Sequence, residues 1–448
     1  MTGMCAGWAR EEITPPEGIH MGGYWGRRSG ATGIHDPLSA SVILWRSSSA
    51  EARGAALVAL DLVGVTPGLA DRIRGQVVEA AGSALSIRPE AVTVCCSHTH
   101  AGPLTMPFRG MGEVDTGYLE SVCGRVGRCA ERAAEGLRPV RLRYARPSVR
   151  IGVNRRQARR GEVVIGEDPH GPVASHAHVL VLEPLSGAPR RAVLFQHACH
   201  PVVLPGANHE ISADFPGAAR RAVEERTGAL AVFVNGAAAD INPRGGHGTF
   251  DEVESLGAEL GAAVAAAEAT ARELEGDGIA WSQARLDLPL TAATAAMEEE
   301  VRRSLDDLEE AVSSAGPDPW ERRVPEACRD WARQWLAEAA RGGPAGSQAF
   351  EIHGLRIGPL ALLGMEGEIF VRYQLDLERG CAAPMILCGY ANGCVGYVPT
   401  ADEYERGGYE IDQAYKVYPS VRMIAPESEA IVRAGAWQVL ESLGIGRR

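Results

Sequence analysis

The sequence lacks the features that mark secreted, membrane-spanning or nucleic-acid-binding proteins. No stretch approaches the roughly 18 consecutive apolar residues that a membrane-spanning helix needs. Residues 1–10 have neither the basic start nor the apolar run of a secretory signal. The formal net charge of -12 and the pI near 5.6 argue against the clustered basic surface that phosphate binding requires. We therefore expect a cytoplasmic protein with no transmembrane segment and no nucleic-acid partner.

Cysteine is sparse, with ten residues in 448, and none of them forms a Cys-x-x-Cys pair. Such pairs are typical of structural zinc sites, so a bound metal would have to be held by histidine and carboxylate instead. Cys95 and Cys96 lie inside an apolar run, where we interpret them as small reduced core residues. The twelve histidines are therefore the first residues to consider for chemistry.

The apolar runs predict a mixed α/β fold. Residues 54–62 and 91–96 read as buried strands, and Thr66 and Pro67 between them supply the N-cap and first-turn proline of a helix. This order is the β-α-β unit of a parallel sheet, whose strand ends commonly carry ligand sites. Further elements are expected as strands at 140–144, 178–183, 192–197 and 229–234, and as a helix at 251–274.

The composition changes between residues 290 and 346, where Ala, Glu and Arg predict a surface insertion of two or three helices interrupted by SSAGPDP and RGGPAG. After it, residues 350–363 return to strand-like alternation, and we expect them to rejoin the first sheet. The sequence contains no internal repeat and no low-complexity linker. We therefore expect layered sheets and helices in a single domain, 1–448, with a metal site at the strand ends.

Two histidines follow the second buried strand, in Ser97-His98-Thr99-His100. Side chains two apart in an extended strand point to the same face, so His98 and His100 should share one pocket. A lone histidine there is more often an ordinary polar residue that caps the strand. The pair instead favours a metal pocket.

A second group of histidines follows the strand predicted at 192–197. It contains His197 and His200, with His209 and Asp214 a little beyond. A hydrolytic zinc ion needs nitrogen and oxygen ligands from several elements and one open position, which two strand-end groups can supply. Histidines bonded to backbone carbonyl groups remain a reasonable interpretation of His197 and His209. We expect one ligand from this group.

Other metallohydrolase patterns do not fit these segments. The metallo-β-lactamase pattern His-x-His-x-Asp-His fails because His100 is followed by Ala-Gly-Pro, and no His-Glu-x-x-His occurs anywhere in the chain. An amidohydrolase barrel would need eight regular β-α units, which the helical insertion and the uneven spacing oppose.

The chain resembles the neutral/alkaline, non-lysosomal ceramidases in motifs that span its length. The SHTHAGP segment at 97–103 resembles that family's SHTHSGP, and the remaining motifs follow in the family's order. They are ITPPEG, GGY and GIHDPL within 13–38, VNRR at 153–156, the His200-Pro201 pair, NGAAADINP at 235–243, LLGMEGEIF at 362–370 and GYVPTADEY at 396–404.

The resemblance implies a zinc-dependent hydrolase that cleaves an N-acyl amide with metal-activated water. It implies one Zn²⁺ per chain, held by His98, His200, Glu368 and Tyr397. Glu366, two residues from Glu368, is the alternative carboxylate. The implied catalytic residues are His100 as proton donor to the amine, Tyr409 as oxyanion donor and Arg155 near the substrate carbonyl, and the candidate substrate-pocket residues are His35, Asn235 and Asp240.

The chain departs from the family at Asn242, where the family motif has serine, which excludes a serine nucleophile. We also expect no secretory signal and no C-terminal immunoglobulin-like domain, which sets ceramide itself aside as the natural substrate. Two alternatives therefore stay open: zinc-dependent acyl transfer or cyclisation on a biosynthetic intermediate, and metal binding without catalysis. Asn235 and Asp240 also fit as turn formers, and His35 fits as a structural histidine.

Overall fold

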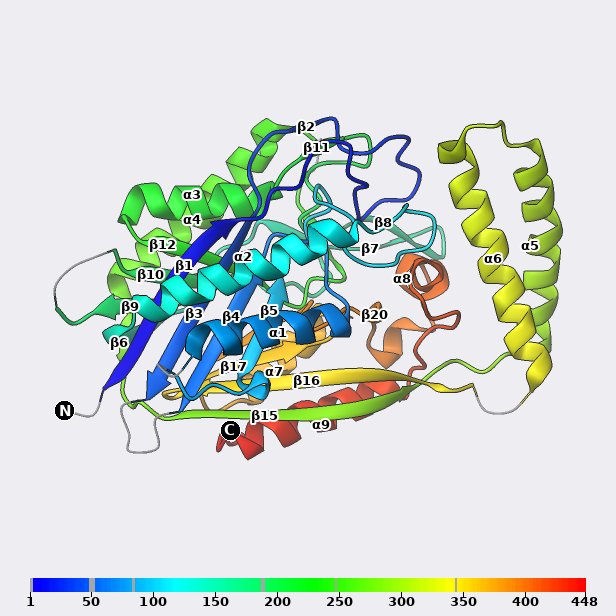
Figure 1. Ribbon diagram of the computed structural model, residues 1–448. Coiled ribbons are helices and arrows are strands. Elements are labelled where there is room, and N and C mark those ends of the chain that lie inside the picture. Colours follow the sequence, from blue (N-terminus) through cyan, green and yellow to red (C-terminus); the bar gives the residue numbers. More distant parts are fainter. Residues whose placement is uncertain (1–2, 48–52, 83–84, 187–189, 246–247, 343–344) are drawn as a thin grey trace.

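The computed structural model describes residues 3–47, 53–82, 85–186, 190–245, 248–342 and 345–448. Figure 1 shows a layered α/β arrangement, as the sequence predicted, with a helical hairpin projecting on one side. Helices cover one face of a large sheet, a smaller sheet packs on its other face, and α9 (Ser428–Ser442) contacts the smaller sheet from outside. No helix within the described ranges is long and apolar enough to cross a membrane.

The largest sheet in the described residues has nine strands. Its order is β12 (Leu230–Asn235), β10 (Ala192–His197), β9 (His178–Pro184), β6 (Arg138–Ala145), β1 (Met4–Glu12), β3 (Ser39–Ser47), β4 (Gly54–Leu60) and β5 (Val92–Cys96), with β14 (Arg272–Leu274) paired to β6. β4 and β5 pair in parallel around α1 (Pro67–Ala81), whose first turn is capped by the Thr66 hydroxyl. The predicted β-α-β unit is therefore confirmed.

The prediction that residues 350–363 rejoin the first sheet is wrong. They form β16 (Ser347–Ile357) and β17 (Leu360–Met365), which build a separate sheet with β15 (Ile279–Pro289) and β19 (Met385–Cys388). Leu355, Leu360 and Leu362 instead pack against apolar side chains of the large sheet in a shared core between the two. Alternation shows that one strand face is buried, but it does not identify the covering layer.

The other helices pack on the outer face of the large sheet or continue the chain at its strand ends. α1 packs with α2 (Thr116–Glu135), and α3 (Asp214–Thr227) packs with α4 (Phe250–Thr270), which occupies most of the helix predicted at 251–274. The shorter helices are α7 (Val371–Gly380), α8 (Tyr409–Asp412), η2 (Pro89–Ala91), η3 (Ala401–Glu403) and η4 (Ala414–Val417).

The predicted helical insertion is confirmed as α5 (Ala295–Ser314) and α6 (Pro319–Arg341). These helices form the hairpin at the right of Figure 1, and Trp331 and Trp335 of α6 join Val301 of α5 in a small core of their own. The predicted RGGPAG interruption begins where α6 ends, and its residues 343–344 lie outside the described residues.

Three small sheets surround the ends of the large one. They are β13 (Ile241–Pro243) with β7 (Gly152–Arg159) and β8 (Glu162–Asp168); β11 (Glu210–Ile211) with β2 (Gly33–Ile34); and β18 (Glu368–Ile369) with β20 (Tyr397–Val398). β5 and β12 stand at opposite ends of the large sheet's strand order, yet they contact each other. The two edges therefore approach, and the loops after β5 and β10 come together.

Candidate metal centre

The loops after β5 and β10 are joined by a buried asparagine at the end of β12. The Asn235 side-chain amide donates to the carbonyl oxygens of Ser97, at 2.9 Å, and Cys199, at 3.1 Å, and its oxygen accepts from the Cys199 N–H. Ser97 and Cys199 each immediately precede a histidine, His98 and His200. Asn235 therefore fixes the spacing of the two histidine loops.

His98 and His200 both direct the ring atom Nε2 toward the cluster, because Nδ1 of each ring is held by a backbone carbonyl group. His98 Nδ1 lies 2.5 Å from the carbonyl oxygen of Val63, and His200 Nδ1 lies 2.6 Å from that of Ala238. Since a carbonyl oxygen only accepts, each Nδ1 carries the proton and each Nε2 presents a lone pair. This arrangement is typical of metal-binding histidines, whose tautomer is set by a backbone partner.

The two Nε2 atoms face one carboxylate oxygen. Glu368 Oε2 lies 3.1 Å from Nε2 of His200 and 3.5 Å from Nε2 of His98. Burial lowers the pKa of His200 to about 4, so its imidazole is neutral at neutral pH. Burial acts to raise the pKa of Glu368, but the adjacent imidazoles hold it well below its ordinary value. A carboxylate and two lone pairs that converge in a buried space fit a bound divalent cation, and the nitrogen and oxygen donors suit zinc.

Tyr397 lies beside Glu368 because β18 and β20 pair in parallel with these two residues in register. Its hydroxyl accepts a hydrogen bond of 2.9 Å from Arg155 Nη2. Tyr397, His98, His100, Glu368 and Tyr409 line one cavity of about 30 Å³. The four residues that the resemblance implied as zinc ligands therefore lie close together. His200 contacts Glu368 but does not line the cavity.

The neighbouring acid Glu366 takes no part in this cluster. Its Oε2 accepts a 2.8 Å hydrogen bond from the backbone N–H of Glu351, and burial raises its pKa to about 8. Glu366 lines a different cavity, and the choice of Glu368 as the ligand stays a prediction.

His100 lies beside His98, but an extended strand does not bring the two rings together as the sequence predicted. β5 ends at Cys96, and His98 has a left-handed φ of 70°, so the two histidines do not lie on an extended strand. Their Nε2 atoms are nevertheless 3.1 Å apart. The Nε2 atoms of His98, His100 and His200 are close enough for His100 to act as a ligand as well.

The charge state of His100 suits a proton-transfer role. Burial, followed by the nearby imidazoles of His98 and His200, places the pKa of His100 well below its ordinary value, so the ring is neutral. Its Nδ1 is buried without a hydrogen-bond partner in the described part of the chain. Gly23 leaves room for the ring, since a Cβ there would lie 2.4 Å from its Cγ atom.

Tyr409 and Arg155 occupy different positions relative to the cavity. Tyr409 lines it with a 38% exposed side chain, and burial raises the pKa of its phenol to about 12, so the hydroxyl can donate. Arg155 is buried behind Tyr397, and its guanidinium also donates to Glu410 Oε1 at 2.7 Å and Asn242 Oδ1 at 3.3 Å. All three guanidinium nitrogens therefore have protein partners.

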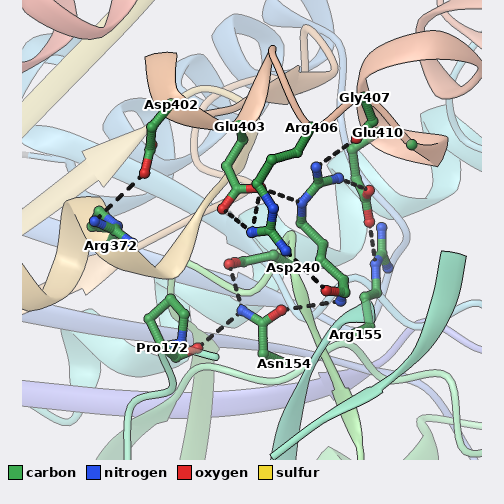
Figure 2. A network of polar contacts seen from close by, with 12 residues as sticks. Asn154, Arg155, Pro172, Asp240, Arg372, Asp402, Glu403, Arg406, Gly407 and Glu410 are labelled. Carbon is green, nitrogen blue, oxygen red and sulfur yellow. Dashed lines mark hydrogen bonds and ion pairs between the residues drawn. The ribbon is translucent and has the colours of Figure 1, made fainter. Parts of the chain in front are cut away.

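A wider ionic network holds this arginine in place (Figure 2). Glu410 also binds Arg156, and Arg156 donates to Glu403 Oε2 at 2.9 Å. Figure 2 shows Asp240 beside Asn154 in the same network; its Oδ2 accepts from Asn154 Nδ2 at 3.0 Å. The network positions the short helix α8, which begins at Tyr409.

The three candidate substrate-pocket residues lie outside the cavity lining. Asn235 joins the histidine loops, as described above. Asp240 Oδ1 accepts the N–H of Val371 at the start of α7, and burial raises the pKa of Asp240 to about 7. His35 stacks on Phe250 with ring centroids 3.6 Å apart. Their substrate roles therefore stay predictions, and the contacts of Asn235 and Asp240 are structural.

The other polar residues of the second histidine group also bind elsewhere. Nδ1 of His197 lies 2.9 Å from the carbonyl oxygen of His176, and Nδ1 of His209 lies 3.0 Å from Ser29 Oγ. Asp214 accepts from backbone N–H groups near the start of α3. Of this group, only His200 reaches the carboxylate cluster in the described residues, and the expectation of one ligand stays a prediction.

Sequence reasoning did not identify two tyrosines that contact the cluster. Tyr418 donates its hydroxyl to Glu368 Oε1 and lines the cavity. Tyr390 stacks on the His98 ring with centroids 3.9 Å apart. Both occur singly in loop segments with no spacing pattern, so the sequence offered no signal for them.

Solved structures provide the comparison for this fold. A crystal structure of neutral ceramidase from Pseudomonas aeruginosa is similar, with a TM-score of 0.69 and 21% identity over 99% of this chain and 75% of that one. A ceramidase complexed with C2 is also similar, with a TM-score of 0.71 and 19% identity over 97% of this chain and 74% of that one. No family model and no curated protein sequence matches the chain. The likeness establishes a ceramidase-like fold.

Proposed function

We propose that the chain is a zinc-dependent hydrolase that cleaves the amide bond of an N-acyl substrate. The observation that carries the proposal is the convergence of the Nε2 atoms of His98 and His200 on Glu368 Oε2, with Tyr397 beside them. The ceramidase-like fold supports an amide as the scissile bond. The substrate is a small molecule, and hydrolysis of short and long N-acyl amides would identify its acyl and amine parts.

His98, His200, Glu368 and Tyr397 would hold the zinc ion. When bound, zinc would supply Lewis-acid activation of water and of the amide carbonyl. Tyr418, hydrogen-bonded to the far carboxylate oxygen, would keep Glu368 ionised and correctly turned. Arg155 would act as a positioning residue because its contact with the Tyr397 hydroxyl holds that ring toward the cavity.

The remaining cavity residues would act on the substrate. The neutral His100 ring would take up a proton during attack and return it to the departing amine. The Tyr409 hydroxyl, whose pKa burial raises further above neutral pH, to about 12, would donate to the developing oxyanion. Neither role needs a protein nucleophile, so Asn242 in place of serine is compatible with this scheme.

Metal content and turnover measured on the same preparations test the proposal. We expect His98→Ala to lose about one zinc equivalent and the amidase activity together, because a catalytic zinc site uses about three protein ligands and an open position. The exposed His170→Ala variant is the matched control and should keep both. Short and long N-acyl amides, with and without chelator, should show chelator-sensitive hydrolysis.

The possible outcomes separate the alternatives. A zinc-loaded wild type that transfers acyl groups to amines or closes rings, but does not hydrolyse, would replace hydrolysis with transfer or cyclisation. A zinc-loaded protein inert toward every acyl amide would indicate metal binding without catalysis. A wild type without metal would refute the proposal.

A further inference from the structure

A second group of metal-binding side chains lies away from the cavity. His178 is the first residue of β9, His176 precedes it by two positions, and Glu378 lies near the end of α7. One carboxylate oxygen of Glu378 lies 2.9 Å from His178 Nε2, and the other lies 2.9 Å from His176 Nε2. The potential ligand atoms all lie within 4.8 Å of one another.

A cationic side chain already occupies the mouth of this group. Nη2 of Arg146 lies 2.9 Å from His176 Nε2 and 2.5 Å from Glu378 Oε2. Since a guanidinium group only donates, Nε2 of His176 can accept from Arg146, which then bridges the imidazole and the carboxylate. Two electron-rich groups are thus held together by a positive charge, which is the position that a metal ion would take.

Neighbouring residues orient these ligands. The Tyr144 hydroxyl lies 2.6 Å from Nδ1 of His178, which leaves Nε2 directed at the carboxylate. The Gln374 side-chain amide donates to Glu378 Oε1 at 2.7 Å. Such outer contacts are typical of metal sites because they fix the rotamer and tautomer of each ligand.

The proposed ligands are more buried than the arginine. The side chains of His178 and Glu378 are 2% and 5% exposed, whereas that of Arg146 is 46% exposed. Arg146 and Tyr144 also line an open depression on the surface. Arg146 can therefore swing outward without disturbing the core.

We propose that His176, His178 and Glu378 form a second site for a divalent transition metal, with Zn²⁺ as the best match. Two imidazoles, one carboxylate and an open fourth position suit zinc, whereas Mg²⁺ and Ca²⁺ prefer oxygen ligands. Metal–ligand bonds of about 2.0–2.1 Å place tetrahedral ligand atoms roughly 3.3 Å apart. The two contacts of 2.9 Å between imidazole and carboxylate would therefore lengthen slightly, and the widest separation, which is within 4.8 Å, would shorten.

Metal at this site would join two parts of the fold. His178 belongs to the large sheet, and Glu378 belongs to α7 in the C-terminal part of the chain. Gln374 also accepts from the N–H of Ala237, one residue before the carbonyl group that binds His200 Nδ1. The ion would therefore brace the loop that orients a candidate catalytic-site ligand, and this proposal does not depend on the reaction carried out there.

Zinc titration of the metal-stripped full chain tests the site. We expect the wild type to bind about one zinc equivalent more than Glu378→Gln. His98→Ala should retain this equivalent, and the His98→Ala/Glu378→Gln double variant should lose it. Equal stoichiometry in wild type and in a folded Glu378→Gln protein would refute the proposal.

An arginine variant provides a second test that leaves all three ligands in place. Arg146→Gln removes the competing cation, so zinc affinity at this site should rise by about tenfold. Arg141→Gln is the matched control because Arg141 lies on β6, which ends one residue before Arg146, and is similarly exposed, at 45%. Unchanged affinity in Arg146→Gln would overturn the proposal even if Glu378→Gln does not fold.

Discussion

Replacing Asn235 with aspartate tests the link between the two histidine loops. The substitution keeps the side chain's shape but turns two N–H donors, directed at the carbonyl oxygens of Ser97 and Cys199, into an acceptor. Each buried carbonyl left unpaired costs about 1–3 kcal/mol, so Asn235→Asp should lower the free energy of unfolding by roughly 2–5 kcal/mol at neutral pH. The spacing of His98 and His200 should also loosen, which lowers zinc affinity.

The loss of stability in this variant should depend on pH. Burial among carbonyl oxygens raises the pKa of the introduced carboxyl above its unfolded value of about 3.9. Below that value both states are protonated and the loss is smallest. As pH rises, the unfolded state ionises first, so the loss grows until the folded-state pKa is passed.

Urea unfolding of chelated protein, near pH 5 and near pH 8, measures this difference directly. Asn208→Asp is the matched control because the Asn208 amide makes an exposed hydrogen bond to the Glu210 carbonyl oxygen. A loss in Asn235→Asp below about 1 kcal/mol near pH 8, or one that does not change with pH, would contradict the role assigned to this side chain.

Three further changes address the cavity and its surroundings. Gly23→Ala should displace His100 and lower kcat about tenfold or more with zinc content unchanged. The control is Gly18→Ala, which has a similar φ of 84° and nothing within 4 Å of an added Cβ, so it reports backbone strain alone. Equal kcat in the two variants would contradict the displacement of His100. Tyr409→Phe should lower kcat about a hundredfold with zinc retained, and an unchanged kcat would remove the residue from catalysis. Because burial raises the pKa of Glu366 to about 8, wild-type stability should fall as pH rises from about 4.5 to 8. Glu366→Gln should flatten this dependence of stability on pH in urea unfolding. Parallel stability curves for the wild type and the variant would refute the raised pKa of Glu366.

Much of the fold could be predicted because local patterns determine it. The apolar runs of β4 and β5 and the Thr66 cap gave the β-α-β unit, and the composition change at 290 gave the helical hairpin. The partner of β16 and β17 could not be predicted, since the pattern reports a buried face and a second sheet buries it as well as the first.

The candidate site, like the fold, could be predicted from the sequence only in part. His98 and His100 were recognisable as a pair, although a left-handed turn, and not an extended strand, brings them together. Glu368 and Tyr397 came from the family resemblance alone. His176 and His178 repeat the His-x-His spacing beside a strand, but their carboxylate comes from a helix 200 residues later, and only the folded chain connects them.

The meeting of β5 and β12 also bears on how the chain folds. The proposed ligand set draws on residues from 98 to 397, so the cavity requires contacts of very long sequence separation, which form slowly because large loops must close first. During synthesis the two histidines would leave the ribosome well before Glu368 and Tyr397. Metal retention would then report that the C-terminal part of the chain has docked, and proteases that cut unfinished chains would act on a protein that cannot yet hold its ion.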